Sequence, residues 1–408
     1  TYFNFFTIGD LQMNKTIKLA VAGAVLSAAS MANAGIIIPA GDWTLDVNGN
    51  VNVYATMQDY DDVVGDAIVG GLSGTKDAAA EDSNQSINTG LLPAWLGFTG
   101  TTRQNDLDVS FTISMQPSVS GNVTTGDQST TLWRQAFLTF GDASWGSIKM
   151  GKDLGVFAGN AILGDMTLLG VGGGYGNSGT ATTLGGIGTG YIYPAWKGQI
   201  TYTTPNMNGF QAKLGIFNPN QVVLNGQAAI SGAGATLYQD RFGMEGQVEY
   251  SFSKGKVWAS GASYKVQQAA GVDFDANAID VGGSLNFGNA GVTAYYYSGE
   301  GAGTTSFGQL GANAAGSERD SDGGYIQGTY VIPSGTKLGV AYGVSKVDRL
   351  TTDAATVLAE NNRWTVGAYH PLTKHLNLVA EYNAVESEDH GTNKTESDAI
   401  SLGAILFF

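Results

Sequence analysis

Apolar and polar residues alternate with a period of two along most of the chain, and the final segment shows the pattern clearly. One face of residues 397–408 carries Ile400, Leu402, Ala404, Leu406 and Phe408. This alternation predicts a strand that crosses a thin membrane, with the terminal aromatic residue at the interface. A buried edge strand of a soluble sheet would show the same pattern, so the rest of the chain must decide between the two.

The longest alternating segment covers residues 42–58. Its odd positions run from Trp43 to Met57 and are mostly apolar, whereas its even positions run from Asp42 to Gln58 and are mostly polar. Strands of soluble proteins are usually ~3–10 residues long, so this segment is unusually extended. A polar face of this length must meet water while the other face meets an apolar environment. The pattern recurs in segments that begin at Leu107, Phe210, Phe242, Ile279, Leu338 and Leu376, and it predicts about sixteen strands.

The connections between these segments form two groups. Short turns are predicted at 104–106, 206–209, 253–256, 288–291, 333–337 and 373–375. Long connections rich in Gly, Asp, Asn and Ser cover 59–90, 154–197, 218–240, 299–323 and 348–362. Short turns at one end and long loops at the other are typical of outer-membrane barrels, and less so of sandwiches or propellers. We therefore predict an all-β transmembrane antiparallel β-barrel of about sixteen strands.

Composition excludes several other classes of protein. No stretch of the mature chain approaches the ~20 consecutive apolar residues that a spanning helix needs. The chain has no cysteine, which excludes disulfides, thiolate zinc sites and cysteine nucleophiles. Three histidines leave little scope for metal or general-base chemistry, and the formal charge of −15 argues against a nucleic-acid partner. We expect no cofactor.

The N-terminal region has the features of an export signal. Residues 13–18 are basic, residues 19–29 form a short apolar core, and Ala32-Asn33-Ala34 fits a cleavage site. We therefore expect a signal peptide at 13–34, a single barrel domain at 35–408, and a mis-assigned extension at 1–12. Export, strand content and the absence of cysteine together indicate a Gram-negative cell envelope.

Three motifs carry a resemblance to a known family. Residues 133–152 (WRQAFLTFGDASWGSIKMGK), residues 94–100 (AWLGFTG) and the final Phe408 resemble the general, non-specific porins of Gram-negative bacteria. The resemblance implies a homotrimer of sixteen-stranded barrels in the cell outer membrane, surrounded by its lipids and lipopolysaccharide. It implies a water-filled pore for passive diffusion of small hydrophilic solutes and ions, and no enzymatic activity. It also implies that the third long loop, predicted at 154–197, folds into the lumen and narrows it.

The resemblance assigns two residues to the pore constriction. Asp165 matches the aspartate of the family's constriction loop, and Arg134 matches the arginine of its fourth strand. An arginine that faced lipid near mid-membrane would cost ~2–4 kcal/mol, so Arg134 should face the lumen.

Other family positions differ in this chain. Asn50, Trp95 and Thr203 stand where the family has basic residues, and Leu169 and Gly170 stand near its second acidic residue. Three lysines would compensate if they line the lumen, although each could equally lie at a rim: Lys149, Lys197 and Lys213. The polar faces also carry acidic residues, namely Glu245, Glu249, Glu381, Asp108 and Asp46. From these we hypothesise a weakly polarised constriction and a mild preference for cations.

Three alternative functions remain. Trp95 and the run Tyr295–Tyr297 would form the solute track of a substrate-specific porin. An outer-membrane enzyme would need clustered Ser, His and acidic residues, and no nucleophile elbow is visible. A plugged structural barrel is the third alternative. Acidic clusters at 59–62 and 320–322 would offer oxygen ligands for calcium, although such clusters are more often solvated loop charges. The glycine-rich segments lack the lysine that follows a phosphate-binding loop.

Overall fold

The computed structural model describes residues 35–61, 68–74, 82–121, 129–174, 182–219, 237–268, 273–313 and 315–408. The predicted extension at 1–12 and signal peptide at 13–34 lie outside this range, as does Asp62 of the first acidic cluster. No helix in the described ranges is long and apolar enough to span a membrane. The same ranges contain no group of three or more acidic or histidine side chains placed to hold a metal.

Sixteen antiparallel strands build one closed sheet, as the alternating pattern predicts. They are β2 (Trp43–Tyr60), β4 (Trp95–Gln104), β5 (Leu107–Gly121), β6 (Ser129–Asp142), β7 (Gly146–Leu154), β8 (Trp196–Thr203), β9 (Phe210–Phe217), β11 (Gly243–Phe252), β12 (Gly255–Gln268), β13 (Phe274–Phe287), β14 (Ala290–Glu300), β15 (Asp320–Val331), β16 (Lys337–Val347), β17 (Leu358–Pro371), β18 (Leu376–Asp389) and β19 (Lys394–Phe407). Three shorter strands, β1 (Ile36–Ala40), β3 (Ser83–Asn88) and β10 (Leu237–Tyr238), pair at its margins.

The last strand closes the barrel against the first. β19 pairs with β2 from Ser397 opposite Tyr60 to Phe407 opposite Asn50. Beyond that register, the backbone of Phe408 exchanges hydrogen bonds of 2.8 and 3.0 Å with Gly49. Closure leaves no unpaired edge between these strands, which is how a sheet satisfies its backbone polar groups in a membrane.

Side chains alternate between the two surfaces of the barrel as predicted. In β2 the even positions from Asn50 to Gln58 are buried, whereas Val51 on the odd face is 51% exposed. Apolar side chains on an outward face suit lipid. The tight turn between β4 and β5 uses Asn105 and Asp106, both with positive φ, as a two-residue hairpin turn requires.

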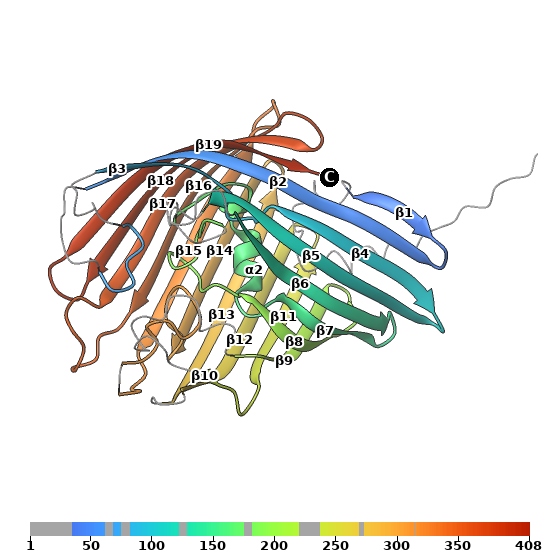
Figure 1. Ribbon diagram of the computed structural model, residues 1–408, viewed down its shortest axis with the longest axis horizontal. Coiled ribbons are helices and arrows are strands. Elements are labelled where there is room, and N and C mark those ends of the chain that lie inside the picture. Colours follow the sequence, from blue (N-terminus) through green and yellow to red (C-terminus); the bar gives the residue numbers. More distant parts are fainter. Residues whose placement is uncertain are drawn as a thin grey trace, which may run out of the picture.

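The apolar core lies inside the barrel rather than between layers. Figure 1 shows the helix α2 (Gly159–Gly164) in the space that the strands surround. Inward-facing tyrosines of several strands are buried in one apolar cluster with α2 and its flanking residues: Tyr54, Tyr264, Tyr295, Tyr325 and Tyr369. The sequence pattern predicts which residues face inward but not that a loop covers many of them.

Candidate channel constriction

The connection between β7 and β8, residues 155–195, is here called the third loop. Its described parts, 155–174 and 182–195, contain α2 and the short 3₁₀ helix η1 (Met166–Leu169). The loop lies against inward-facing side chains of strands from β11 to β18, and of β2. Tyr54 on β2, for example, donates a hydrogen bond of 2.7 Å to the carbonyl of Leu169. The loop therefore runs across the interior of the barrel.

Three carboxylates on the inner wall of the barrel accept hydrogen bonds from backbone N–H groups of the third loop. Glu245 on β11 accepts from Val156 and Phe157 at 2.5 and 3.0 Å. Asp280 on β13 accepts from Ala158 at 3.0 Å. Irregular backbone inside a barrel cannot satisfy its own amides, so charged acceptors on the wall fix its position strongly.

The fourth and fifth amides bind to Glu381 on β18. Its Oε2 accepts from Val171 at 2.9 Å and from Gly172 at 2.8 Å. Gly170 makes this approach possible, because a Cβ at that position would lie 2.0 Å from Oε1 of Glu381. The sequence places Glu381 on a polar inward face, and the structure uses it as an anchor for the loop.

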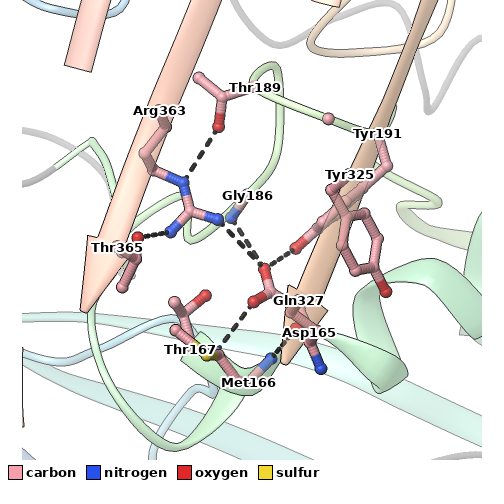
Figure 2. A network of polar contacts seen from close by, with 12 residues as sticks. Asp165, Met166, Thr167, Gly186, Thr189, Tyr191, Tyr325, Gln327, Arg363 and Thr365 are labelled. Carbon is pink, nitrogen blue, oxygen red and sulfur yellow. Dashed lines mark hydrogen bonds and ion pairs between the residues drawn. The ribbon is translucent and has the colours of Figure 1, made fainter. Parts of the chain in front are cut away.

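Asp165 lies at the centre of a polar network that Figure 2 shows. Its carboxylate accepts from the backbone of Thr167 at 2.8 Å and of Gly186 at 3.0 Å, and from the Tyr191 hydroxyl at 2.8 Å. Burial and the adjacent carboxylate raise the pKa of Tyr191 well above its usual value, so its hydroxyl stays a donor. Asp165 thus joins the two described parts of the third loop.

The charge partner of Asp165 is Arg363 on β17, with Nη2 3.8 Å from Oδ2. Arg363 also donates to Thr189 at 3.2 Å and to Thr365 at 2.6 Å (Figure 2). Asp165 is only 5% exposed. Asp165 is therefore enclosed by its own loop and by Arg363. Its place at the pore constriction stays a prediction.

Arg134 lies at a β-bulge of β6. The register passes from Ser114 opposite Gln135 to Met115 opposite Trp133, which makes Arg134 the additional residue. Its backbone N–H donates to Oε1 of Gln116 at 3.0 Å, and its side chain is half-buried. No ion pair of Arg134 occurs within the described residues. Its role at the constriction stays a prediction.

Lys197, predicted to line the lumen, instead belongs to a buried triad. Its ammonium forms an ion pair with Glu245 and a hydrogen bond of 2.9 Å with the Tyr264 hydroxyl, and Tyr264 donates to Glu245. Lys197 is 2% exposed. It therefore neutralises an anchor of the third loop and presents no charge to solutes in this structure.

The remaining predicted residues fall into two groups. Asn50 and Trp95 are buried, and their side chains donate to the Pro93 carbonyl at 2.9 Å and to Asn48 at 3.3 Å. Thr203, Lys213 and Glu249 are half-buried near the short-turn end of the barrel, where Thr203 pairs with Lys213 in register. Their part in lining a pore stays a prediction.

Lys213 differs from its charged neighbours. Lys149 forms an ion pair with Asp153, and Lys256 pairs with Glu249 at 3.2 Å. These four groups act electrostatically on Lys213, whose side chain has no ion pair or hydrogen bond within the described residues. Two balanced pairs and one unbalanced ammonium give this part of the interior a net positive charge.

Sequence reasoning missed Arg363 and Asp280, although a signal for both was present. Arg363 alternates with the outward residue Trp364, and Asp280 lies between the outward residues Ile279 and Val281. Inward parity alone would have marked both as interior charges. What the pattern lacks is any indication of the loop that each one holds.

A model of the Gram-negative porin family matches residues 19–390. The fold resembles that of an anion-selective porin from Comamonas acidovorans, with 17% identity, a TM-score of 0.65, and coverage of 90% of this chain and 100% of that one. It also resembles the outer-membrane channel DcaP of Acinetobacter baumannii, with 17% identity, a TM-score of 0.67, and coverage of 92% and 100%. A third likeness is OmpF of Salmonella typhi in complex with daunomycin, with 16% identity, a TM-score of 0.60, and coverage of 91% and 100%. No curated protein matches the sequence.

Proposed function

Because the chain belongs to the Gram-negative porin family, we propose that its barrel is a general diffusion channel for small hydrophilic solutes and ions. The protein is a pore-forming barrel of the outer membrane. Solutes would move down their gradients, without an enzymatic step, through the part of the lumen that the third loop leaves open.

The inward face of β4, β5 and β6 supports general diffusion. It carries hydroxyl and amide side chains that bond to one another, such as Thr99 to Thr112 at 3.1 Å and Ser114 to Gln135 at 2.9 Å. These neutral groups are at most 9% exposed, and they carry no charge or ring that would select one chemical class of solute.

The aromatic residues argue against the substrate-specific alternative. Tyr295 and Tyr297 face inward but are 4% and 0% exposed, and Tyr296 faces outward. Trp95 is buried in the same apolar cluster as Tyr54. These side chains pack against the loops and offer no aromatic track to a passing solute.

Single-channel recording of the purified protein in planar bilayers tests this proposal. We expect stepwise conductance that rises in proportion to salt concentration, and liposome swelling in small neutral sugars. Saturable block by one solute class would favour a specific porin. An absence of steps from correctly folded protein would favour a plugged structural barrel or an outer-membrane enzyme.

The charge preference is expected to be weak. Three of the five acidic residues behind the predicted cation preference form ion pairs within the described residues: Glu245 with Lys197, Glu249 with Lys256, and Asp108 with Arg103 at 2.8 Å. In a potassium chloride gradient we expect a small reversal potential of cation sign. A large potential of anion sign would contradict the predicted preference.

Lys213 provides a sharper prediction about charge. Replacement by glutamine removes the unbalanced ammonium, so the reversal potential should move further toward the cation value. Lys254→Gln is the matched control, since Lys254 is exposed in the turn between β11 and β12. Equal reversal potentials for the two variants would show that Lys213 does not face the ion path.

We also propose that the channel is a homotrimer embedded in outer-membrane lipid and lipopolysaccharide. Trimer assembly rests on the family and on the apolar outward faces of β2 and β19, which include Val51 and Leu402. Unheated protein should migrate as a trimer in detergent gels and as a monomer after boiling. Migration as a monomer before heating, with native cross-linking also negative, would contradict the trimer.

A further inference from the structure

A second connection also folds into the barrel. Residues 301–313 follow β14, and the base of this connection is closed because the N–H of Gly301 donates to the carbonyl of Arg319, next to β15, at 2.9 Å. Every residue from 301 to 308 is buried. An extracellular loop normally lies in water, so burial of the whole segment means that it is packed inside the rim.

This loop is seated on the third loop. The N–H of Tyr193 donates to the carbonyl of Thr305 at 2.8 Å, and Tyr193 pairs with Ser306 in a parallel bridge. The ring of Phe307 meets Phe157 edge-on at 5.5 Å, and Tyr264 edge-on at 4.9 Å. Loop 301–313 therefore contacts both the first and the last residues of the third loop.

The side chain of Arg319 connects loop 301–313 to Asp353. Its Nη1 donates to the carbonyls of Leu310 and Ala312, both at 2.8 Å. Its Nε and Nη2 donate to the carboxylate of Asp353 at 2.7 and 2.9 Å. These hydrogen bonds lower the pKa of Asp353, which therefore stays charged at neutral pH. Only a planar guanidinium reaches two carbonyls and both carboxylate oxygens together.

The conformation of the loop depends on this support. Leu310 has a φ of 59°, a left-handed conformation that is unfavourable for a residue with a branched side chain. Its side chain is held in an apolar cluster with Ile68, Val347 and Leu358. Backbone strain of this kind persists where the surroundings enforce it, so loss of the Arg319 contacts should release the segment.

We propose that loop 301–313 is a second constriction element, seated above the third loop, and that Arg319 is the positioning residue that holds it there. The proposal rests on the proposed diffusion function and adds a determinant of solute size. Solutes that enter from outside meet loop 301–313 first and the third loop second. The solutes are small molecules, neutral or charged, and loop 301–313 sets the maximum width of those that pass.

Arg319→Gln tests the proposal, because glutamine cannot satisfy the two carbonyls and the carboxylate at once. We expect about a twofold rise in single-channel conductance, since conductance follows the open cross-section of a pore. Swelling of liposomes should accelerate more for trisaccharides than for monosaccharides. Arg349→Gln is the matched control and should leave both readouts unchanged, since the side chain of Arg349 bonds, among the described residues, only to the backbone carbonyl of Asp353.

A reversible disulfide between loop 301–313 and the third loop tests whether Arg319 acts by positioning the loop or only by stabilising the fold. The chain has no cysteine, so Tyr193→Cys with Ser306→Cys introduces a single pair at bridged positions within reach of a disulfide. In the Arg319→Gln background, the oxidised protein should recover wild-type conductance and size limit, and reduction should abolish that recovery. Heat-modifiable mobility in detergent gels verifies that each variant is folded.

The outcomes separate the two proposals. Wild-type protein without conductance would reject the diffusion channel. A conducting wild-type protein with an unchanged size limit in Arg319→Gln would reject the second constriction. Failure of the oxidised pair to restore the size limit would also reject it, because a loop fixed in place would then have no effect on solutes.

Discussion

Replacing Lys197 with methionine is expected to lower the free energy of unfolding by about 3–5 kcal/mol. Lys197 is the only cation that forms an ion pair with Glu245 within the described residues, and both side chains are buried. Methionine would leave the carboxylate charged in an interior without its counter-ion. Glu245 would retain the Tyr264 hydroxyl and the two loop amides, which do not replace a full positive charge.

Urea unfolding of the protein in detergent micelles, followed by tryptophan fluorescence, measures this effect. The double variant Lys197→Met with Glu245→Gln removes both charges and should recover much of the loss. Lys374→Met, in the exposed turn between β17 and β18, is the matched control and should change stability by less than about 1 kcal/mol. A loss this small in Lys197→Met would mean that water reaches Glu245.

Replacing Asp165 with alanine is expected to loosen the third loop, although Glu245, Asp280 and Glu381 still hold its backbone at the wall. The change removes three hydrogen bonds within the loop and leaves Arg363 buried without an ion-pair partner in the described part of the chain. Loss of one partner from a buried ion pair costs about 3–5 kcal/mol. Single-channel records should show higher conductance and more open-channel noise, because the loop then fluctuates across the lumen.

Two companion variants test the assignment of partners. Asp165→Ala combined with Arg363→Met should be less noisy than Asp165→Ala alone, because no unpaired charge remains. Arg134→Met should leave the noise at the wild-type level, since Arg134 has no contact with Asp165 in the structure. Equal noise in Arg134→Met and Asp165→Ala would instead show that Arg134 also holds the third loop in place.

The strands were predictable because their information is local. Alternation in residues 42–58 identified β2, its inward face and its outward face, and the same rule located the other strands of the barrel. In such a pattern, residues two positions apart lie on the same face of the strand, so a short segment is enough to assign each face. Membrane and lumen impose that period directly, so few competing structures fit it.

The site was less predictable because its contacts are distant in sequence. Gly172 and Glu381 are separated by 209 residues, and neither shows in its own segment that the other is its partner. At Arg134 the local rule itself fails, because the bulge adds one residue and disturbs the alternation of the strand. Family resemblance assigned Asp165 and Arg134 to the constriction, but it gave no indication that Arg363 is the ion-pair partner of Asp165.

The residues that anchor the third loop also bear on the order in which its contacts form during folding. The loop is complete by residue 195, whereas its anchors lie on β11, β13, β17 and β18, which follow it in the chain. Contacts between residues so far apart form late, because a long segment must be ordered first. Glu381 comes only one strand before the closing strand β19. We therefore expect the third loop to reach its position near the end of folding, since a chain that stops before β18 has the loop but lacks Glu381, which binds two of its amides.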